Sequence, residues 1–512
     1  MRKLIVMSLI LLAAYFSYCQ DNFENIELHA EITSVQPMTG IVFWSNSSNN
    51  NTDAISLEFS YMLFSEVVKD SGVYVWDKVE EKLNDIASRN HQAIFRFRYV
   101  YPGYKTSVPA YILNRNDYNE TVGLSEGRTT YFPDWENEEL MRFTLEFYKE
   151  FSARYDNDPR LAFIQVGFGL WGEYHIYDGP FVLGKTFPSK AFQEQFFYNL
   201  DSCFENIPWS ISIDAADDTY SPFESHPELK DLKFGLFDDS FMHSSHSGYN
   251  TTCWNFFDRN RYQSSPGGGE FSYYSNYDQA HVLDYPDGPY GKPFETFARD
   301  FHISYMIGND QPNYQSMERI KEASMASGYR FKIVSLKTTT DSSVFEILNF
   351  GVAPIYYDAY IAVNGVKSSE SLKYLAPGQT KVFSVPAGAK NAEITIESEK
   401  LVPGQKIEFY GTQELPTTSI KKKEINSGFN IYPNPVNAGT IYIELDNFNE
   451  NEDISLYVYN VMGQQIEHKT IRQVDVNSKV SLSTRKWESG VYFIKTQGKR
   501  MQQTTKIIIE QI

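Results

Sequence analysis

The stretch LAFIQVGFGLWGEYH, residues 161–175, joins a short apolar run to a loop rich in glycine and polar residues. The first part, residues 161–167, has the length and composition of a strand. The second part delivers Trp171, Glu173 and His175 directly beyond it. Glycines leave room for the backbone and a bulky ring to approach a ligand closely. The stretch therefore predicts a strand that ends in a ligand site.

Strand-like and helix-like runs alternate along the chain to about residue 326. Apolar residues fall at helical spacing in residues 76–90 and 136–155. We expect strands at residues 40–44, 56–64, 92–99, 161–167, 209–214, 233–238, 267–271 and 301–307. This alternation predicts a parallel sheet covered by helices, and eight strands suit a closed (β/α)8 barrel of the TIM type. The strand at residues 267–271 has the weakest sequence pattern of the eight, because these residues lack β-branched side chains.

The pattern changes after the barrel to short strands without helices, at residues 329–336, 344–349, 359–363, 381–385 and 392–397. Such spacing predicts an antiparallel β-sandwich. Further short strands near the C-terminus predict a second, smaller β-sandwich. The expected organisation is a signal peptide at 1–20, a catalytic barrel at 28–326, a sandwich at 327–411, a linker at 412–428 and a C-terminal domain at 429–512.

The N-terminus has the basic start and short apolar core of a signal peptide. The apolar run is too short to span a membrane, and no later segment is apolar enough to do so. A lipoprotein signal at Cys19 is an alternative, which the bulky Tyr18 disfavours. Of the later cysteines, Cys203 and Cys253 are expected to be buried or joined in a single bridge.

The C-terminal segment contains three motifs in order: IYPNP at residues 431–435, YNVMG at 459–463 and GVYF at 490–493. At these residues the chain resembles the C-terminal sorting domain of type IX secretion substrates. The resemblance implies that the type IX secretion machinery is a partner, and that the protein passes the periplasm before it is released or attached at the cell surface. The alternative is an ordinary carbohydrate-binding or adhesive sandwich.

Composition narrows the choice of binding partner. The net charge of −19 disfavours nucleic acid, because a phosphate backbone would be repelled. Aromatic residues make up 16% of the chain, more than a core needs, so rings are available for surfaces and clefts. Sugars bind on such rings, and the negative net charge also disfavours a strongly acidic polymer. A neutral or mildly acidic carbohydrate is therefore the expected substrate.

Catalytic groups of a (β/α) barrel stand at the C-terminal ends of its strands. Polar or aromatic residues at these places are Trp44, Glu66, Arg96, Arg98, Glu173, His175, Asp214, Asp238, Asp239, Glu270 and His302. Glu173 and Glu270 are singled out because each follows a glycine-rich backbone. Cleavage of a glycosidic bond needs one protonated and one ionised carboxyl group, which two facing glutamates supply.

Carboxylates after strands four and seven resemble the arrangement of clan A glycoside hydrolases, which are retaining enzymes. Residues 131–135, 154–160, 169–173 and 301–305 together resemble an uncharacterised family of such barrels with a trailing β-sandwich, over residues 40 to 400. The resemblance implies that Glu173 is the acid/base and Glu270 the nucleophile, roughly 5 to 5.5 Å apart. One departure is Gly172, because most clan A enzymes have Asn before the acid/base.

Other side chains are expected to bind the substrate. Trp44, Trp135 and Trp171 are sugar platforms in one interpretation and core residues in the other. Arg96 and Arg98 alternate with Phe95 and Phe97, so both arginines point the same way, into the barrel mouth or towards the helices. The remaining substrate-binding candidates are His175, Asp214 and His302.

Two further functions remain open. The protein could be a non-catalytic glycan-binding protein of the cell surface on a barrel scaffold. It could also be a metal-dependent hydrolase that uses His243, His246, His302, Asp238 and Asp239, although their spacing fits no strong metal motif. We expect no metal and no cofactor.

Overall fold

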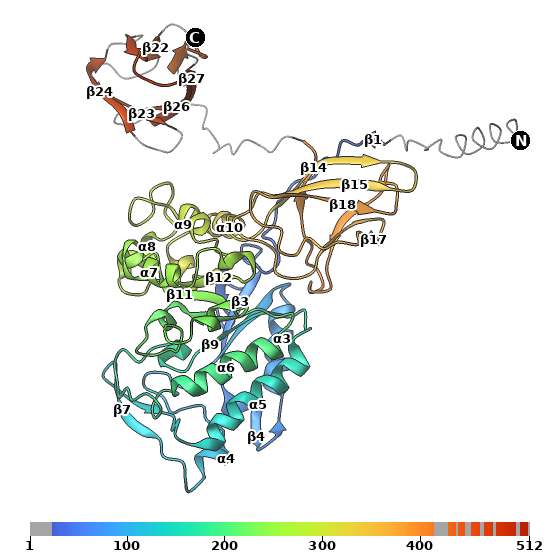
Figure 1. The fold of residues 1–512 in the computed structure, drawn as a ribbon, viewed down its shortest axis with the longest axis vertical. Helices are drawn as coiled ribbons and strands as arrows, with labels where there is room; N and C mark the ends of the chain where they lie inside the picture. The colour runs from blue at the N-terminus through green and yellow to red at the C-terminus, as the bar shows by residue number, and fades with distance from the viewer. Residues whose placement is uncertain are drawn as a thin grey trace, which may run out of the picture. The chain divides into compact units, whose positions relative to one another are not determined.

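A computed structural model of the protein describes residues 23–413, 429–436, 439–445, 452–460, 465–474, 478–497 and 502–509 (Figure 1). The signal peptide expected at 1–20 and nearly all of the expected linker lie outside these residues. The chain forms two compact units, Met1–Gln413 and Glu414–Ile512.

The first unit contains a closed barrel of eight parallel strands in the order β10-β11-β12-β13-β2-β3-β6-β9. These strands are β2 (Gly40–Trp44), β3 (Leu57–Met62), β6 (Gln92–Phe97), β9 (Leu161–Val166), β10 (Trp209–Ser212), β11 (Gly235–Phe241), β12 (Gly267–Phe271) and β13 (Tyr305–Ile307). The predicted barrel is confirmed, including the glycine-rich strand β12. Gly268 in β12 is required by packing, because a Cβ there would lie 2.3 Å from the ring of Tyr305.

The eighth strand is shorter than the sequence predicts. Helix α9 (Phe294–Asp300) occupies the residues just before it, and Phe301 caps that helix. His302 then adopts a positive φ of 53°, which interrupts an extended chain. Strand β13 can therefore begin only at Tyr305.

Helices cover the outside of the barrel (Figure 1). The predicted helical runs form α3 (Asp77–Ala87) and α5 (Glu138–Tyr155), whose apolar stripes are buried. The other α-helices are α2 (Phe64–Val67), α4 (Ala110–Leu113), α6 (Lys190–Cys203), α7 (Tyr249–Phe256), α8 (Asn276–His281) and α10 (Met317–Met325). Single-turn helices are η1 (Leu170–Gly172), η2 (Ile213–Ala216), η3 (Pro227–Asp231), η4 (Ser244–Ser247), η5 (Arg261–Gln263) and η6 (Gln311–Asn313). Loop hairpins pair β4 (Val68–Asp70) with β5 (Val73–Tyr74) and β7 (Thr121–Ser125) with β8 (Arg128–Phe132).

The predicted sandwich follows the barrel and has two sheets. One contains β14 (Phe331–Thr338), β15 (Ser343–Asn349), β18 (Thr380–Val385), β20 (Phe409–Tyr410) and β1 (Glu24–Asn25), and the other contains β16 (Tyr360–Val363), β17 (Val366–Lys367) and β19 (Ile394–Glu397). Burial alternates along β15, as expected for a strand with one face in a core. Two features were not predicted: β1 comes from before the barrel, and β20 pairs with β14 in parallel.

The sandwich contacts the barrel at the N-terminal ends of the barrel strands. Tyr329 donates a hydrogen bond to the carbonyl of Pro37, just before β2, at 3.1 Å. Tyr356 donates to the carbonyl of Tyr262, before β12, at 2.6 Å. Gln92, the first residue of β6, donates to the carbonyl of Lys400 at 2.7 Å. These contacts leave the opposite, C-terminal end of the barrel to its own loops.

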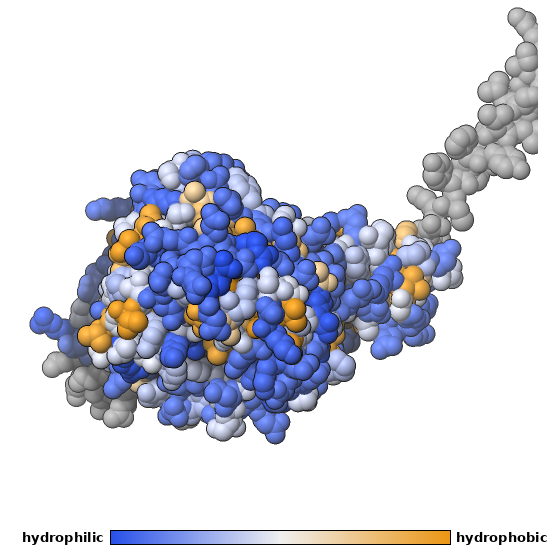
Figure 2. All heavy atoms as spheres, turned by 90° about the horizontal axis from the view of Figure 1, so that it is seen from below, coloured by the Kyte–Doolittle hydropathy of each residue, from blue (hydrophilic) through white to orange (hydrophobic). Residues whose placement is uncertain are grey.

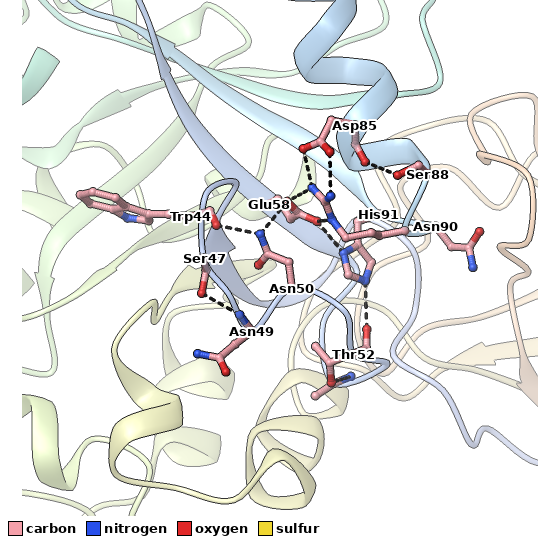
Figure 3. A network of polar contacts seen from close by, with 12 residues as sticks. Trp44, Ser47, Asn49, Asn50, Thr52, Glu58, Asp85, Ser88, Asn90 and His91 are labelled. Atoms are coloured by element: carbon pink, nitrogen blue, oxygen red, sulfur yellow. Dashed lines mark hydrogen bonds and ion pairs between the residues drawn. The ribbon is translucent and has the colours of Figure 1, made fainter.

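A buried network fixes the loop after β2 (Figure 3). Glu58 of β3 is fully buried and accepts two hydrogen bonds from Arg89, each 2.8 Å long. His91 Nδ1 lies 2.8 Å from the same carboxylate. Asn50 donates to Glu58 and also to the carbonyl of Trp44, at 2.9 Å each. The network therefore ties the end of β2, where Trp44 stands, to the scaffold around α3.

The second unit consists of two antiparallel sheets, β21-β22-β25 and β24-β23-β26-β27. Their strands are β21 (Phe429–Tyr432), β22 (Thr440–Leu445), β23 (Glu452–Asn460), β24 (Gln465–Val474), β25 (Ser478–Ser483), β26 (Gly490–Gln497) and β27 (Gln502–Ile509). Buried aliphatic residues of both sheets form its core. The GVYF motif lies in β26, whereas the end of the YNVMG motif lies outside the described residues.

The surface of the molecule is mostly hydrophilic on the face shown in Figure 2, where hydrophobic residues form small separate patches. Cys203 and Cys253 are both free, and Cys253 is buried.

Candidate active site

Arg96 lies at the centre of the candidate site, inside the barrel. Its side chain is only 1% exposed, and its Nη1 lies 2.9 Å from Asp239 Oδ2 and 3.5 Å from Glu173 Oε1. The guanidinium also lies over the ring of Phe237, 4.3 Å from the centroid. Arg96 of β6 therefore points into the barrel and holds together a carboxylate of β11 and a carboxylate of the loop after β9.

Gln165 of β9 positions Arg96. Its Oε1 accepts hydrogen bonds from Arg96 Nε at 2.8 Å and from Nη2 at 2.6 Å. Its own amide donates to Tyr305 OH at 3.0 Å. Sequence reasoning missed Gln165, although a buried polar residue within the run LAFIQV was a usable signal, because such a residue needs partners.

The loop after β9 folds tightly back on itself and presents Glu173 inward. The backbone N–H groups of Phe168 and Gly169 both donate to the carbonyl of Glu173, at 3.0 and 2.8 Å. A Cβ at Gly169 would lie 2.0 Å from the carbonyl oxygen of His175, so this position requires glycine. The predicted need for glycines thus has a steric cause in this loop.

Gly172 occupies the place where the resembling family has Asn. It has a positive φ of 70°, and a Cβ there would lie 3.1 Å from Arg96 Cδ and 3.2 Å from Arg98 Cβ. The preceding Trp171 also has a positive φ, of 59°, and its carbonyl accepts a hydrogen bond from Arg96 Nη1 at 3.2 Å. Gly172 is therefore a packing requirement of Arg96, which lies against it.

His175 lies between two carboxylates. Its Nε2 is 3.1 Å from Glu173 Oε2, and its Nδ1 is 3.0 Å from Asp214 Oδ2. Asp214 also accepts a hydrogen bond from Ser212 Oγ at 2.6 Å. Burial alone would lower the pKa of His175, but the charges of Asp214 and Glu173 outweigh it and raise that pKa well above its usual value. An imidazolium therefore faces Glu173 on one side, while Arg96 faces it on the other.

Glu270 and Asp239 are the carboxyl groups with the most perturbed acidity. Burial raises the pKa of Glu270 to about 8, and the charge of Glu173 adds to this rise while Arg96 opposes it. Burial also raises the pKa of Asp239 well above its usual value, again opposed by Arg96. Among the described residues, Glu270 Oε1 and Asp239 Oδ1 are enclosed without a hydrogen-bond donor, whereas Asp239 Oδ2 is paired with Arg96. Such atoms are where the hydroxyl groups of a ligand can bind.

Asp239 appeared among the strand-end residues and in the metal-site alternative, but not among the catalytic or substrate-binding residues predicted for a glycoside hydrolase. The alternation of β11 separates it from Asp238. Asp238 is fully buried and accepts hydrogen bonds from Trp254 Nε1 at 3.0 Å and Asn250 Nδ2 at 2.9 Å. Asp238 thus belongs to the packing around α7, whereas Asp239 points at Arg96.

The histidines considered for a metal site do not converge. His246 Nε2 lies 3.1 Å from Asp238, whereas His243 Nδ1 lies 2.7 Å from Asp278. Within the described part of the chain, one group has potential ligand atoms close enough to share an ion: Glu173, His175 and Asp214, within 4.8 Å of one another. Because both ring nitrogens of His175 already face carboxylates, the arrangement suits hydrogen bonding.

The predicted sugar platforms differ in their surroundings. Trp171 is half-buried, makes an edge contact with Tyr101 at 4.5 Å between centroids, and donates to Tyr177 OH at 3.2 Å. Trp44 is also half-buried and lies beside Tyr61, with centroids 6.0 Å apart. Trp135 is only 2% exposed and packs against Phe168 and Phe192. Trp135 is therefore a core residue, which corrects its prediction as a platform.

Arg98 follows Arg96 on the same side of its strand and lies among aromatic rings. Its guanidinium is 4.4 Å from the centroid of Tyr101 and 5.8 Å from that of Tyr104. The structure thus places Arg98 at the edge of the site, above Arg96.

His302 lies at the other end of the barrel. It precedes β13, its Nδ1 is 2.7 Å from the carbonyl oxygen of Val352 in the sandwich, and its ring stacks on Tyr262 at 3.5 Å. The prediction that His302 contacts the substrate with the other candidates is wrong. It resulted from extending the eighth strand too far towards the N-terminus.

Comparison with known families identifies the C-terminal unit. The model of the secretion system C-terminal sorting domain matches residues 430–510. This match confirms the predicted type IX sorting domain and indicates export to the cell surface or the extracellular space. None of the helices in the described part of the chain is long and apolar enough to cross a membrane.

Several solved barrel enzymes resemble the chain at low identity. An endo-β-1,4-mannanase double mutant from Cellulomonas fimi has a TM-score of 0.29 and 8% identity, with 93% of this chain and 95% of that chain covered. A β-glucuronidase from Parabacteroides merdae has a TM-score of 0.28 and 7% identity, with 95% of this chain and 64% of that chain covered. An α-galactosidase from Geobacillus stearothermophilus has a TM-score of 0.32 and 9% identity, with 68% of this chain and 55% of that chain covered. No curated protein matches the chain.

Proposed function

We propose that the protein is a secreted retaining glycoside hydrolase that cleaves a poly- or oligosaccharide with Glu173 and Glu270. The observation that carries this proposal is the group of Glu173, Asp239 and Glu270 around Arg96, in which the pKa of Glu270 is raised to about 8. Two facing carboxyl groups of unequal acidity are what glycosidic cleavage requires. In this proposal the barrel at residues 28–326 carries the reaction.

The charges around the two glutamates favour the reverse of the roles implied by the resemblance. Glu173 faces the cations Arg96 and His175, which stabilise a negative charge on it. Glu270 is protonated at neutral pH because burial raises its pKa. Glu270 is therefore the general acid in our proposal, and Glu173 is the nucleophile.

The reaction then proceeds in two steps. Glu270 gives its proton to the glycosidic oxygen as the bond to the anomeric carbon breaks, and Glu173 forms a bond to that carbon. Glu270, now a carboxylate, takes a proton from water, and the resulting hydroxide displaces Glu173 from the sugar. Burial raises the pKa of Glu270, and the charge of Glu173 adds to this rise. A retaining course requires the two carboxyl groups to lie about 5 to 5.5 Å apart, so that both reach the same anomeric carbon.

Other side chains at the mouth would hold the sugar. Trp44 and Trp171 offer partly exposed ring surfaces, and Arg98 offers a guanidinium at the same edge. The enclosed Oδ1 of Asp239 would accept a hydrogen bond from a sugar hydroxyl. His175, which Asp214 holds in place, would stabilise the carboxylate of Glu173. Both residues would also contact the sugar at the surface of the site.

The test is a screen of the purified full-length protein against neutral and mildly acidic polysaccharides, with the anomer of the first product followed by NMR. We expect hydrolysis with retention, and loss of several orders of magnitude in Glu173→Gln and Glu270→Gln. Background rates of the wild-type protein on every glycan would contradict the proposal. A first product of inverted anomeric configuration would reject the covalent bond between Glu173 and the sugar, but not the proposal that the protein is a glycoside hydrolase.

Two rival functions have distinct outcomes in the same screen. A non-catalytic glycan-binding protein would bind a polysaccharide without cleaving it, and neither glutamine substitution would change this. A metal-dependent hydrolase would lose its activity on dialysis against EDTA and regain it with the metal. We expect the rate of hydrolysis to stay unchanged after dialysis against EDTA, because the proposed steps use carboxyl groups alone.

A further inference from the structure

Four tyrosines with exposed side chains gather after β12, the strand that carries Glu270. Tyr273 is 49% exposed, Tyr274 77%, Tyr277 52% and Tyr290 44%. They belong to the loop after β12, to α8 and to the segment between α8 and α9, all beyond the C-terminal end of the strand. We call these four residues the tyrosine rim.

A buried carboxylate organises the rim. Asp278 is fully buried and accepts hydrogen bonds from Tyr290 OH at 2.5 Å and from Ser272 Oγ at 2.8 Å. His243 Nδ1, from the loop after β11, lies 2.7 Å from Asp278 Oδ2. Within the described residues, none of these groups forms a hydrogen bond or an ion pair with the carboxylates around Arg96, so the network has no role in the proposed reaction.

This network holds aromatic rings in fixed positions at the surface. The ring of Tyr274 stacks on His243 with centroids 4.7 Å apart, which leaves its other face open. Tyr277 donates to the carbonyl of Pro289 at 2.8 Å, and its ring lies 6.0 Å from that of Tyr290. Rings fixed in advance lose little conformational freedom when a ligand binds.

We infer that the tyrosine rim binds sugar units of the same chain that enters the barrel, beyond the unit whose bond is cleaved. This inference rests on the proposed function and makes the substrate class more specific: a carbohydrate chain of several units. Continuity with the site supports it, because Tyr273 is only three residues beyond Glu270. Burial raises the pKa of Tyr273, and the negative charge of Glu270 adds to this rise.

The chemistry of the rim favours carbohydrate over a protein partner. A sugar presents C–H groups to a ring face and hydroxyl groups to polar atoms, which tyrosine and histidine supply together. A protein-binding surface would be expected to add exposed aliphatic side chains. The exposed large hydrophobic residues between 271 and 300 are all tyrosines, whereas exposed Val and Leu residues occur elsewhere, at Val122, Leu124 and Val182.

The test is affinity electrophoresis of the full-length protein in gels that contain soluble glucan, mannan, xylan or galactan. All proteins carry Glu270→Gln so that the polysaccharide stays intact. Tyr274→Ala is compared with Tyr198→Ala, which removes another exposed tyrosine, from α6 on the outside of the barrel. We expect Tyr274→Ala to weaken binding about tenfold, the scale of one aromatic contact, and Tyr198→Ala to leave it unchanged.

A conservative variant separates ring stacking from folding. Tyr274→Phe keeps the ring, so it should retain most of the binding that Tyr274→Ala loses. Equal retardation of the Tyr274→Ala and Tyr198→Ala proteins, or no retardation on any of the polysaccharides, overturns the inference. Binding through the rim without any hydrolysis by wild-type protein would instead reject the proposed function and leave the rim as a glycan-binding surface.

Discussion

Arg96 and Asp239 form an ion pair of 2.9 Å inside the barrel, although they come from strands that are far apart in the sequence. The pair is one side of a larger group, since the same Nη1 lies 3.5 Å from Glu173. One cation thus offsets the repulsion between carboxylates that would otherwise be too costly to enclose. The first prediction follows from this relationship.

Arg96→Leu should destabilise the protein by about 3–5 kcal/mol, because it leaves Asp239 buried without its cation and removes one of the two cations beside Glu173. Chemical denaturation of the full-length protein measures the change. The matched control is Arg154→Ala, which removes an exposed ion pair with Glu80 and should leave the free energy of unfolding nearly unchanged. Equal costs for the two variants would show that the buried pair has no special role.

The pH dependence of the reaction should report Glu270. As the general acid it must be protonated, and its pKa is raised to about 8. The ratio kcat/KM should therefore stay level through neutral pH and fall as the pH rises above about 8. A rate that stays constant well above this pH would assign the acid role to another group, with Asp239 the first to test by Asp239→Asn.

Gly172→Ala should impair catalysis more than stability. The positive φ alone costs about 1–2 kcal/mol, but the added Cβ also presses on Arg96, which holds Glu173. A displacement near 1 Å at a reacting group lowers the rate by about a hundredfold, and the smaller shift that a contact of 3.1 Å requires should lower it by less than this. Gly365→Ala is the control, because Gly365 has a φ of 79° and no neighbour within 4 Å. If both variants keep full activity, the contact with Arg96 does not position the site.

Arg89→Ala should destabilise the barrel by about 3–5 kcal/mol, since Glu58 is fully buried and loses two of its donors. Asp85→Ala, which removes the exposed partner of the same arginine, should cost about 0–1 kcal/mol. Thermal and denaturant unfolding measure both. A loss of similar size in the two variants would mean that the network in Figure 3 contributes no more than a surface ion pair.

Local sequence patterns predicted the barrel well because each strand has its own apolar run and each long helix its own apolar stripe. They failed where a neighbour decides the structure, as at His302, where a helix cap shortened the eighth strand. Glu173 stood out because its loop glycines are visible in the sequence. Gln165 and the inward direction of Asp239 depend on contacts between distant strands, which no local pattern contains.

The pairing of Glu24–Asn25 with Lys337 and Thr338 has a consequence for how the molecule assembles. These partners stand on opposite sides of the whole barrel sequence, so they meet only after the barrel segment between them has been synthesised. Contacts of such long sequence separation form slowly, because a large loop must close first. A shortened protein that ends at the barrel would keep β1 without its partner strand and expose an unpaired edge, a hazard for aggregation.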